Sequence, residues 1–261
     1  MRRVKKNIFR LGIMLKSPHI ILIIAGFFFL FSSCKKQNLC DCFKSRGETV
    51  IETRNVPNFN TLRAFDKIDV YFTQDTTLTN PVIKVVTGKH LLSNITTEVS
   101  DGELKIENNN KCNFVRGSHN DVTVYVSAPY VKYFIQDGVG SIFGTNTVIQ
   151  DSVDCNLRNS GDIHLDVKTS CVVGHMHGIG DLYVSGTANS FFANTVGQGF
   201  IYAQNFVVPY AYIYYKSNGE ARVNISGQLD AEIASTGNLY YTGASPVVNV
   251  KITGTGKLIK F

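Results

Sequence analysis

Five side chains with flat, polarisable groups recur at near-constant spacing in the second half of the sequence. They are His164, Tyr183, Tyr202, Arg222 and Tyr240, separated by 19, 19, 20 and 18 residues. Rings and a guanidinium on one surface can stack against sugar rings or against a partner protein. Aromatic residues also suit strands and stabilise them by pairing with one another, so a purely structural role is the alternative. We predict that these five residues form one outward surface, a candidate binding surface.

Carboxylates and imidazoles supply a second set of candidates. Asp162 and Asp181 on neighbouring repeats could bind calcium or act as an acid and a base, although a solvated charge beside a turn is the plainer interpretation. His175 and His177 could form half of a zinc site, but the sequence offers no third ligand nearby. No nucleophile elbow, phosphate-binding loop or zinc-protease motif is present. The sequence thus predicts no catalytic residue, no metal, no cofactor and no enzymatic activity.

All of these residues keep step with seven glycine-centred bends. Successive bends end 21, 19, 19, 20, 18 and 19 residues apart, at Gly140, Gly161, Gly180, Gly199, Gly219, Gly237 and Gly256. A period of this length is typical of solenoids, in which each repeat is one structural unit stacked on the next. Glycine at a bend indicates either a positive φ or a close approach of two backbones. The repeat therefore predicts a coil whose corners are the glycine bends.

Apolar residues alternate with polar residues on both sides of each bend, which is the period of a strand. Two residues after the bends come Ile142, Ile163, Leu182, Ile201, Ala221, Leu239 and Leu258, and matching series precede the bends, such as Val153-Cys155-Leu157 and Val248-Val250-Ile252. Before the first bend, Val131, Tyr133 and Ile135 are out of phase by one, which predicts a bulge or a transition rung. The chain is predicted to be all-β, a right-handed parallel β-helix with rungs of about 19 residues.

The two ends of the predicted coil differ. Residues 55–129 show strand alternation and a hairpin signal at Ser100-Asp101-Gly102-Glu103, so this N-terminal β part is predicted to cap the regular rungs of residues 130–261. The sequence still follows the strand pattern at Leu258–Phe261, without a recognisable cap. An uncovered strand edge tends to pair, so end-to-end stacking into a homo-oligomer is a further expectation.

The first 34 residues are typical of a lipoprotein signal. Six basic and no acidic residues precede a 12-residue apolar run, 20–31, and Ser32-Ser33-Cys34 follows. That run is short of the roughly 20 residues that span a membrane. We predict a signal peptide at 1–33, lipidation of Cys34, a polar tether over 34–54 and a single domain over 55–261. Removing the signal leaves 20 basic and 20 acidic residues, so the formal charge of +6 does not indicate nucleic-acid binding.

Five cysteines follow Cys34. Cys155 falls on an inward strand position and is predicted to be a buried, unreactive side chain. The sequence leaves the pairing of Cys40, Cys42, Cys112 and Cys171 open, because an odd number of cysteines leaves at least one unpaired within the chain.

The bends and the strands that follow them resemble a known family. Ser160-Gly161-Asp162-Ile163-His164-Leu165 and Ile179-Gly180-Asp181-Leu182-Tyr183-Val184 resemble the head GIN domain family of Bacteroidetes, whose members are described as adhesin heads, and Phe65–Val70 looks like its N-terminal portion. Together with the lipoprotein signal, we expect an outer-membrane lipoprotein of the cell envelope, on the periplasmic or the surface side; the resemblance brings no catalytic residues. We expect a non-enzymatic surface for adhesion or scaffolding, with a glycan or a protein as partner. The alternative is a carbohydrate-binding or polysaccharide-active β-helix.

Overall fold

The computed structural model describes residues 45–110, 122–244 and 247–261. Within these ranges the chain is almost entirely β-strand, and Leu92–Asn94 forms a short 3-10 turn. No helix in this part of the chain is long and apolar enough to cross a membrane. The predicted signal peptide, Cys34, the tether up to residue 44 and Cys112 lie outside the described residues.

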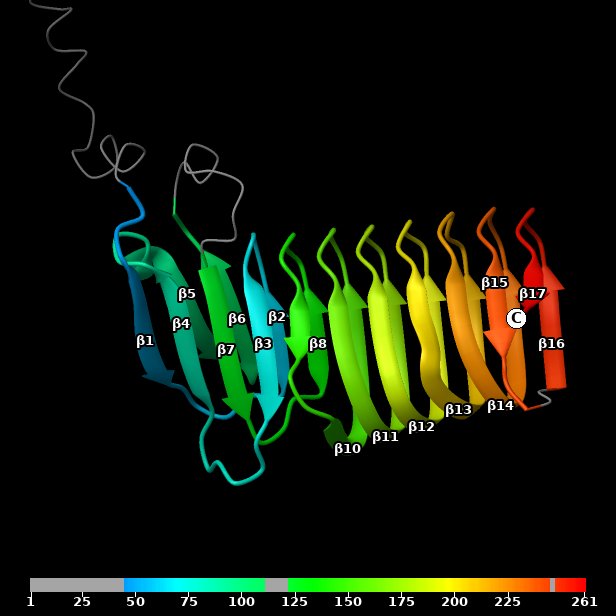
Figure 1. Cartoon of the computed structure of the whole chain (residues 1–261), viewed down its shortest axis with the longest axis horizontal. Helices are drawn as coiled ribbons and strands as arrows, with labels where there is room; N and C mark the ends of the chain where they lie inside the picture. The colour runs from blue at the N-terminus through cyan, green and yellow to red at the C-terminus, as the bar shows by residue number, and fades with distance from the viewer. Residues whose placement is uncertain (1–44, 111–121, 245–246) are drawn as a thin grey trace, which may run out of the picture. The chain divides into compact units, whose positions relative to one another are not determined.

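Long parallel strands form the regular part of the molecule (Figure 1). They are β10 (Val148–Leu157), β11 (Ile163–Met176), β12 (Leu182–Thr195), β13 (Ile201–Tyr215) and β14 (Ala221–Ile233), followed by the shorter β15 (Leu239–Thr242), β16 (Val247–Ile252) and β17 (Leu258–Lys260). Each long strand turns a corner, so that its two halves pair on different sides of the coil. The two halves of β14, for example, pair separately with β15 and with β16. The predicted parallel β-helix is confirmed.

We call the two sides the post-bend sheet and the pre-bend sheet. The post-bend sheet contains residues that follow each glycine bend, from β9 (Ile142–Gly144) through the first halves of β11–β14 to β15 and β17. The pre-bend sheet contains residues that precede each bend, from β8 (Tyr133–Gln136) through the second halves of β10–β14 to β16. Their inner faces enclose one apolar core.

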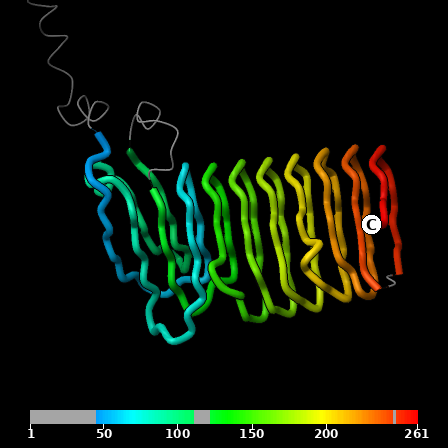
Figure 2. Tube along the Cα trace, viewed as in Figure 1, coloured from blue at the N-terminus to red at the C-terminus, as the bar shows by residue number. Residues whose placement is uncertain are grey.

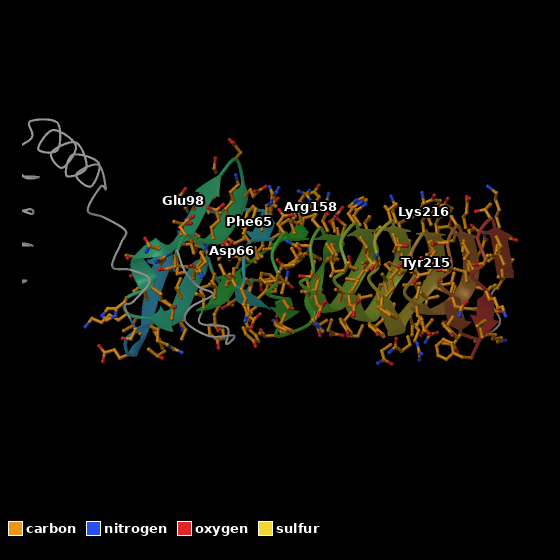
Figure 3. All side chains as sticks on the ribbon, turned by 90° about the horizontal axis from the view of Figure 1, so that it is seen from above. Phe65, Asp66, Glu98, Arg158, Tyr215 and Lys216 are labelled. Carbon is orange, nitrogen blue, oxygen red and sulfur yellow. The ribbon has the colours of Figure 1, made fainter. Side chains whose placement is uncertain are left out.

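The register between rungs confirms the predicted inward columns. One column in the post-bend sheet is Ile142, Ile163, Leu182, Ile201, Ala221 and Leu239, and one in the pre-bend sheet is Leu157, Met176, Thr195, Tyr215 and Ile233. All of these side chains are buried. Figure 3 shows Tyr215 within the width of the coil, with Lys216 and Arg158 at its margin. Each buried Leu or Ile contributes roughly 1.5–3 kcal/mol to folding, so the core supplies the main stabilising term.

The first rung corrects a prediction. Phe134 and Gln136, not Tyr133 and Ile135, face inward and pair with Cys155 and Leu157, so the strand Tyr133–Gln136 keeps the register of the later rungs. The predicted phase change lies just before it: Val131 is also buried, and the carbonyl oxygen of Asn60 accepts hydrogen bonds from the amides of both Lys132 and Tyr133, at 2.8 and 3.0 Å. The error came from treating Gln136 as an outward residue. Its buried side chain instead serves the bend: Nε2 donates a hydrogen bond of 2.6 Å to the carbonyl oxygen of Gly140, and Oε1 accepts one of 2.8 Å from the amide of Gly138.

The bends need glycine because adjacent backbones lie very close together. None of the seven closing glycines has a positive φ; the glycines that do are Gly47, Gly102, Gly186 and Gly243. A Cβ added to Gly180 would lie 2.1 Å from the carbonyl oxygen of Gly161, and one added to Gly161 would lie 1.8 Å from that of Gly140. Of the two explanations for glycine at the bends, close approach is therefore the correct one.

The N-terminal part adds rungs out of chain order. Its strands are β1 (Thr49–Asn55), β2 (Thr61–Ala64), β3 (Asp69–Gln74), β4 (Val82–Gly88), β5 (Ile95–Ser100), β6 (Glu103–Asn108) and β7 (Val122–Ala128), followed by β8 and β9. The rung formed by β2 and β3 lies between those of β6–β7 and β8–β9, as the trace in Figure 2 shows. Antiparallel strands β1, β4 and β5 complete this end. The cap begins earlier than expected, since all of β1 except its last residue, Asn55, lies inside the segment predicted to be tether.

The predicted hairpin joins β5 to β6. Asp101 and Gly102 both have positive φ, at 52° and 75°, as expected for a tight turn between antiparallel strands. At the other end of the coil the prediction of inward side chains fails for Ile252, which is 51% exposed, because β16 pairs only with β14 within the described residues. In the same ranges β17 pairs only with β15.

Replacing Gly180 with alanine should destabilise the coil. The added methyl would collide with a backbone carbonyl that cannot move without shifting the neighbouring rung, so we expect a loss of about 1–3 kcal/mol in the free energy of unfolding. Gly144→Ala is the matched control, because its Cβ would meet the mobile end of Leu165 at 3.1 Å; a loss below about 1 kcal/mol is expected. Urea titrations measure both, and equal stabilities would contradict the close-approach explanation.

End-to-end self-association stays a prediction that one substitution can test. The amide of Phe261 donates to the carbonyl oxygen of Tyr241 in β15, and because amides alternate along a strand, that of Lys260 points away from β15. If copies pair through this edge, Lys260→Pro should reduce the dimer fraction in analytical ultracentrifugation. Lys251→Ala serves as the control, because it changes a side chain that is 69% exposed and leaves every backbone amide in place. A monomer at every concentration would rule out stacking.

Candidate functional site

The five residues of the predicted binding surface form one column on the outer face of the post-bend sheet. His164, Tyr183 and Tyr202 pair in register, and Arg222 and Tyr240 continue the column on the next two rungs. The rings of His164 and Tyr183 lie 4.1 Å apart at 6°, and those of Tyr183 and Tyr202 lie 4.5 Å apart at 15°. The guanidinium carbon of Arg222 lies 5.3 Å from the centre of the Tyr240 ring.

Three further rings extend this column toward the N-terminal part. Phe143 lies 4.8 Å from His164, Tyr71 lies 5.2 Å from Phe143, and Tyr125 lies 5.3 Å from Tyr71, all stacked. They are not among the residues predicted from the sequence. Phe143 follows Gly140 at the same three-residue offset as the others, so spacing could have identified it. Tyr71 and Tyr125 carried no such signal, because their rungs are stacked out of chain order.

We call the stack Tyr125, Tyr71, Phe143, His164, Tyr183 and Tyr202 the aromatic ladder. Strands one rung apart are about 4.8 Å from each other, so rings at equal register stack face to face along the coil. Each inner ring therefore has both faces covered by neighbours and turns only its edge outward. A sugar ring stacks on an aromatic face, so the interior of the ladder is unsuited to the sugar-stacking role considered from the sequence. Its geometry favours the structural alternative.

The ladder also changes the ionisation of its own members. Burial lowers the pKa of His164 from 6.5, and the nearby carboxylates of Asp162 and Asp181 only partly oppose this effect. Burial also raises the pKa of Tyr183 to about 12, with a further contribution from the negative charge of Asp181. Both rings are therefore held in their uncharged forms at neutral pH.

Asp162 and Asp181 join rungs rather than forming a free acid pair. Asp162 Oδ1 accepts a hydrogen bond of 2.8 Å from the amide of Asp181, and Asp181 Oδ1 accepts one of 2.8 Å from the amide of Phe200. Asn238 accepts from the amide of Lys257 at 2.9 Å in the same way. Burial is the main cause that raises the pKa of Asp181. These side chains satisfy backbone donors next to the glycine bends, which is a structural role.

The two histidines considered for zinc lie on different elements. His175 is on β11 in the pre-bend sheet, with Nε2 3.7 Å from Asp154 Oδ2, whereas His177 lies in the following bend. Within residues 45–110, 122–244 and 247–261 no three His, Cys, Asp or Glu side chains come together as metal ligands. Cys155 is buried, as predicted, and burial raises the pKa of its thiol far above the usual range. In the described ranges Cys155 and Cys171 are free thiols.

A second aromatic group lies on the outer face of the pre-bend sheet. Phe192 belongs to β12, and Tyr210, Tyr212 and Tyr214 belong to β13. Phe192 meets Tyr210 edge to face at 5.9 Å and 65°, and no other ring pair within this group is in contact. Alternation with the buried Ala211, Ile213 and Tyr215 could have identified the three outward tyrosines from the sequence.

Two hollows open beside Tyr212. One, of about 220 Å³, is lined by residues of β11–β13 that include His175, Phe192 and Asn194. The other, of about 510 Å³, is lined by residues of β13, β14 and β16 that include Asp230, Asn249 and Lys251. The side chain of Tyr212 lines both and is 43% exposed. It therefore stands between the hollows, in contrast to the covered rings of the ladder.

Comparison with known proteins adds a family and a set of similar folds. A family model described as "Putative auto-transporter adhesin, head GIN domain" matches residues 58–245. No curated protein matches the chain. A putative adhesin from Bacteroides fragilis has a similar structure, with a TM-score of 0.74 at 19% identity over 82% of this chain and 97% of that one.

Two further solved structures are similar. A putative adhesin from Parabacteroides merdae has a TM-score of 0.64 at 17% identity, covering 83% of this chain and 98% of its own. A protein from Parabacteroides distasonis called a putative lipid binding protein has a TM-score of 0.65 at 20% identity, with coverage of 83% and 98%. At these identities the likeness shows the fold.

Ring stacking in the ladder should be measurable as an energetic coupling. A double-mutant cycle of His164→Ala and Tyr183→Ala should give an interaction of about 0.5–1.5 kcal/mol in the free energy of unfolding. Tyr183→Ala with Tyr240→Ala is the control pair; these residues are three rungs apart, so their effects should add within about 0.5 kcal/mol. Coupling as small in the first pair as in the second would show that the stacking does not stabilise the fold.

The lowered pKa of His164 makes stability depend on pH. The unfolded chain takes up the proton near pH 6.5, and the folded chain takes it up only at a lower pH. The stability that neutral His164 contributes is therefore complete above pH 6.5 and is lost as the pH falls through the lowered pKa of the folded state. His164→Phe keeps a ring and removes the proton site. The free energy of unfolding of wild type should therefore fall relative to His164→Phe between pH 7.5 and 5. Parallel profiles would contradict the assignment.

Proposed function

The chain belongs to the head GIN domain family of putative auto-transporter adhesins, and we propose that it is a lipid-anchored, non-enzymatic protein of the cell envelope that presents its outer faces for adhesion or scaffolding. The observation that carries the proposal is the β-solenoid itself. Its core is filled by side chains, and what remains for interaction is a pair of long outer faces. Similar folds in putative adhesins from Bacteroides and Parabacteroides support the same proposal.

The anchor is proposed from the first 34 residues. The basic segment, the 12-residue apolar run and Cys34 together have the order of a lipoprotein signal. A lipid on Cys34 would attach the chain to a membrane surface, with residues 35–48 lying between the lipid and the first described strand, which begins at Thr49. Among membranes, the outer membrane is our proposal because the solved structures that resemble the chain come from Bacteroides and Parabacteroides.

Surface presentation explains the carboxylates better than polysaccharide cleavage does. A glycosidase needs two carboxyl groups free to face the scissile bond. Asp162 and Asp181 instead accept hydrogen bonds from backbone amides of the next rung, and Asp230 accepts hydrogen bonds from the side chains of Gln228 and Asn249. We therefore propose binding rather than polysaccharide cleavage. Lipid binding, the name given to one similar structure, finds no support in the packed core of this solenoid.

The anchor can be tested by labelling cells with radioactive palmitate. Wild type and Cys40→Ala should incorporate the label, whereas Cys34→Ala should remain unlabelled at the size of the precursor. Cys40→Ala is the matched control because it removes a cysteine six residues away. Normal labelling of Cys34→Ala would rule out the proposed anchor.

Surface presentation can be tested with the chain from residue 35 onward fixed on beads. The beads should retain extracellular polymers from the producing cells and release them at their original length, because a non-enzymatic binder does not shorten its ligand. Beads carrying heat-unfolded protein are the control. Retention no greater than the control would contradict a role in adhesion, and shortened polymers would contradict a non-enzymatic one.

A further inference from the structure

The two outer faces of the solenoid use their aromatic residues differently. On the post-bend sheet, ladder neighbours His164 and Tyr183 stack at 6° and cover each other's faces. On the pre-bend sheet, Phe192 and Tyr212 are also neighbours in register, but Phe192 turns its edge to Tyr210. Tyr212 has no ring partner among the described residues. Its side chain therefore remains open to the hollows on both sides.

Polar side chains that are not hydrogen-bonded within the described protein surround the Tyr212 ring. Within the described ranges, the side-chain amide of Asn194 and the hydroxyls of Tyr212 and Tyr214 have no hydrogen-bond partner, and Asn194 and Tyr214 line the smaller hollow with Tyr212. These groups contrast with Asp162 and Asp181, each of which accepts a hydrogen bond from a backbone amide of the next rung. An open ring flanked by free donors and acceptors is the arrangement that fixes a ligand with both an apolar face and hydroxyl groups.

The charges around the larger hollow favour an uncharged ligand. Lys251 Nζ lies 3.3 Å from Glu232 Oε1, so its charge is already paired. Among the described residues Asp230 forms no ion pair; it accepts hydrogen bonds from Gln228 at 2.8 and 2.9 Å, from Asn249 at 2.9 Å and from the hydroxyl of Tyr210. These donors lower the pKa of Asp230, so it is an anion at neutral pH. An anionic ligand would meet this carboxylate, whereas a neutral hydroxyl could donate to it.

We propose that Tyr212 and the two hollows beside it bind a neutral polysaccharide. Two linked sugar rings would lie on either side of the Tyr212 side chain, with C–H faces against the phenol ring and hydroxyls toward Asn194 on one side and Asp230 and Asn249 on the other. The combined hollows are in the size range of a small-molecule site. A protein partner would instead require a contact on the order of 800 Å² per side. This inference rests on the proposed surface role and deepens it by naming a site and a ligand class.

Affinity electrophoresis of the chain from residue 35 onward provides the test. Native gels are cast with dextran, laminarin, xyloglucan or mannan as neutral probes and with polygalacturonate as an anionic probe. We expect retardation by at least one neutral probe and none by polygalacturonate. For that probe, Tyr212→Ala should weaken binding about tenfold, while Tyr212→Phe, which keeps the ring, should stay within about threefold of wild type.

Tyr130→Ala is the matched control, because Tyr130 is 40% exposed, close to the 43% of Tyr212, and lies outside both hollows. It should bind as wild type does, and thermal melting should show all three variants folded. Asn194→Ala should weaken binding without changing the melting temperature. These results together would support the site.

Other outcomes would overturn the inference in distinguishable ways. Retardation that Tyr212→Ala leaves unchanged would place the sugar site elsewhere, and retardation by polygalacturonate alone would reject the neutral class. No retardation by any probe, with bead retention of cell polymers intact, would reject sugars and leave the proposed surface role standing. Loss of bead retention as well would reject the surface role itself.

Discussion

The fold depends on how closely one glycine bend approaches the next. A Cβ on Gly180 would lie only 2.1 Å from the backbone of the preceding rung, and a Cβ on Gly199 would lie 2.0 Å from the carbonyl oxygen of Gly180. The amide of Gly180 reaches the carbonyl oxygen of Asn159 at 3.0 Å across this gap, so the bends themselves are hydrogen-bonded from rung to rung. Both strands that leave a bend are thereby placed one rung above their equivalents, and the register of both sheets follows.

This spacing also decides what the outer side chains can do. Rings at equal register on neighbouring rungs are separated by about the distance at which aromatic groups stack, which produces the ladder from Tyr125 to Tyr202. Where the repeat changes length, the pattern changes too. Register shifts between Tyr183 and Gly186 and between Ala203 and Val207 place irregular pairing around the middle of β13. The ladder ends close to this point, and beyond Tyr202 the column continues with Arg222 instead of a ring.

The sequence was sufficient to predict the parallel β-helix and the inward columns, because glycine spacing and alternation both report a local repeat that the stacking preserves. The column of His164, Tyr183 and Tyr202 followed from the same arithmetic. Gln136 was misjudged because polarity usually indicates an outward residue, whereas this amide is satisfied inside by Gly138 and Gly140. The right hand of the coil, the lipidation of Cys34 and the ligand stay predictions.

What sequence periodicity could not supply is the difference between two outer faces that both carry aromatic residues. The spacing of His164, Tyr183 and Tyr202 and that of Val173, Phe192 and Tyr212 are almost the same, since both sets pair in register. Ring orientation separates them, because a side chain can either stack along the coil or turn aside, as Phe192 does toward Tyr210. In a stacked column the ring faces are covered by neighbouring rings and stabilise the fold, whereas in an interrupted column the ring faces stay exposed to solvent. A regular solenoid can therefore place a binding site where the repeat of its outer side chains is broken, without changing the core that sets its shape.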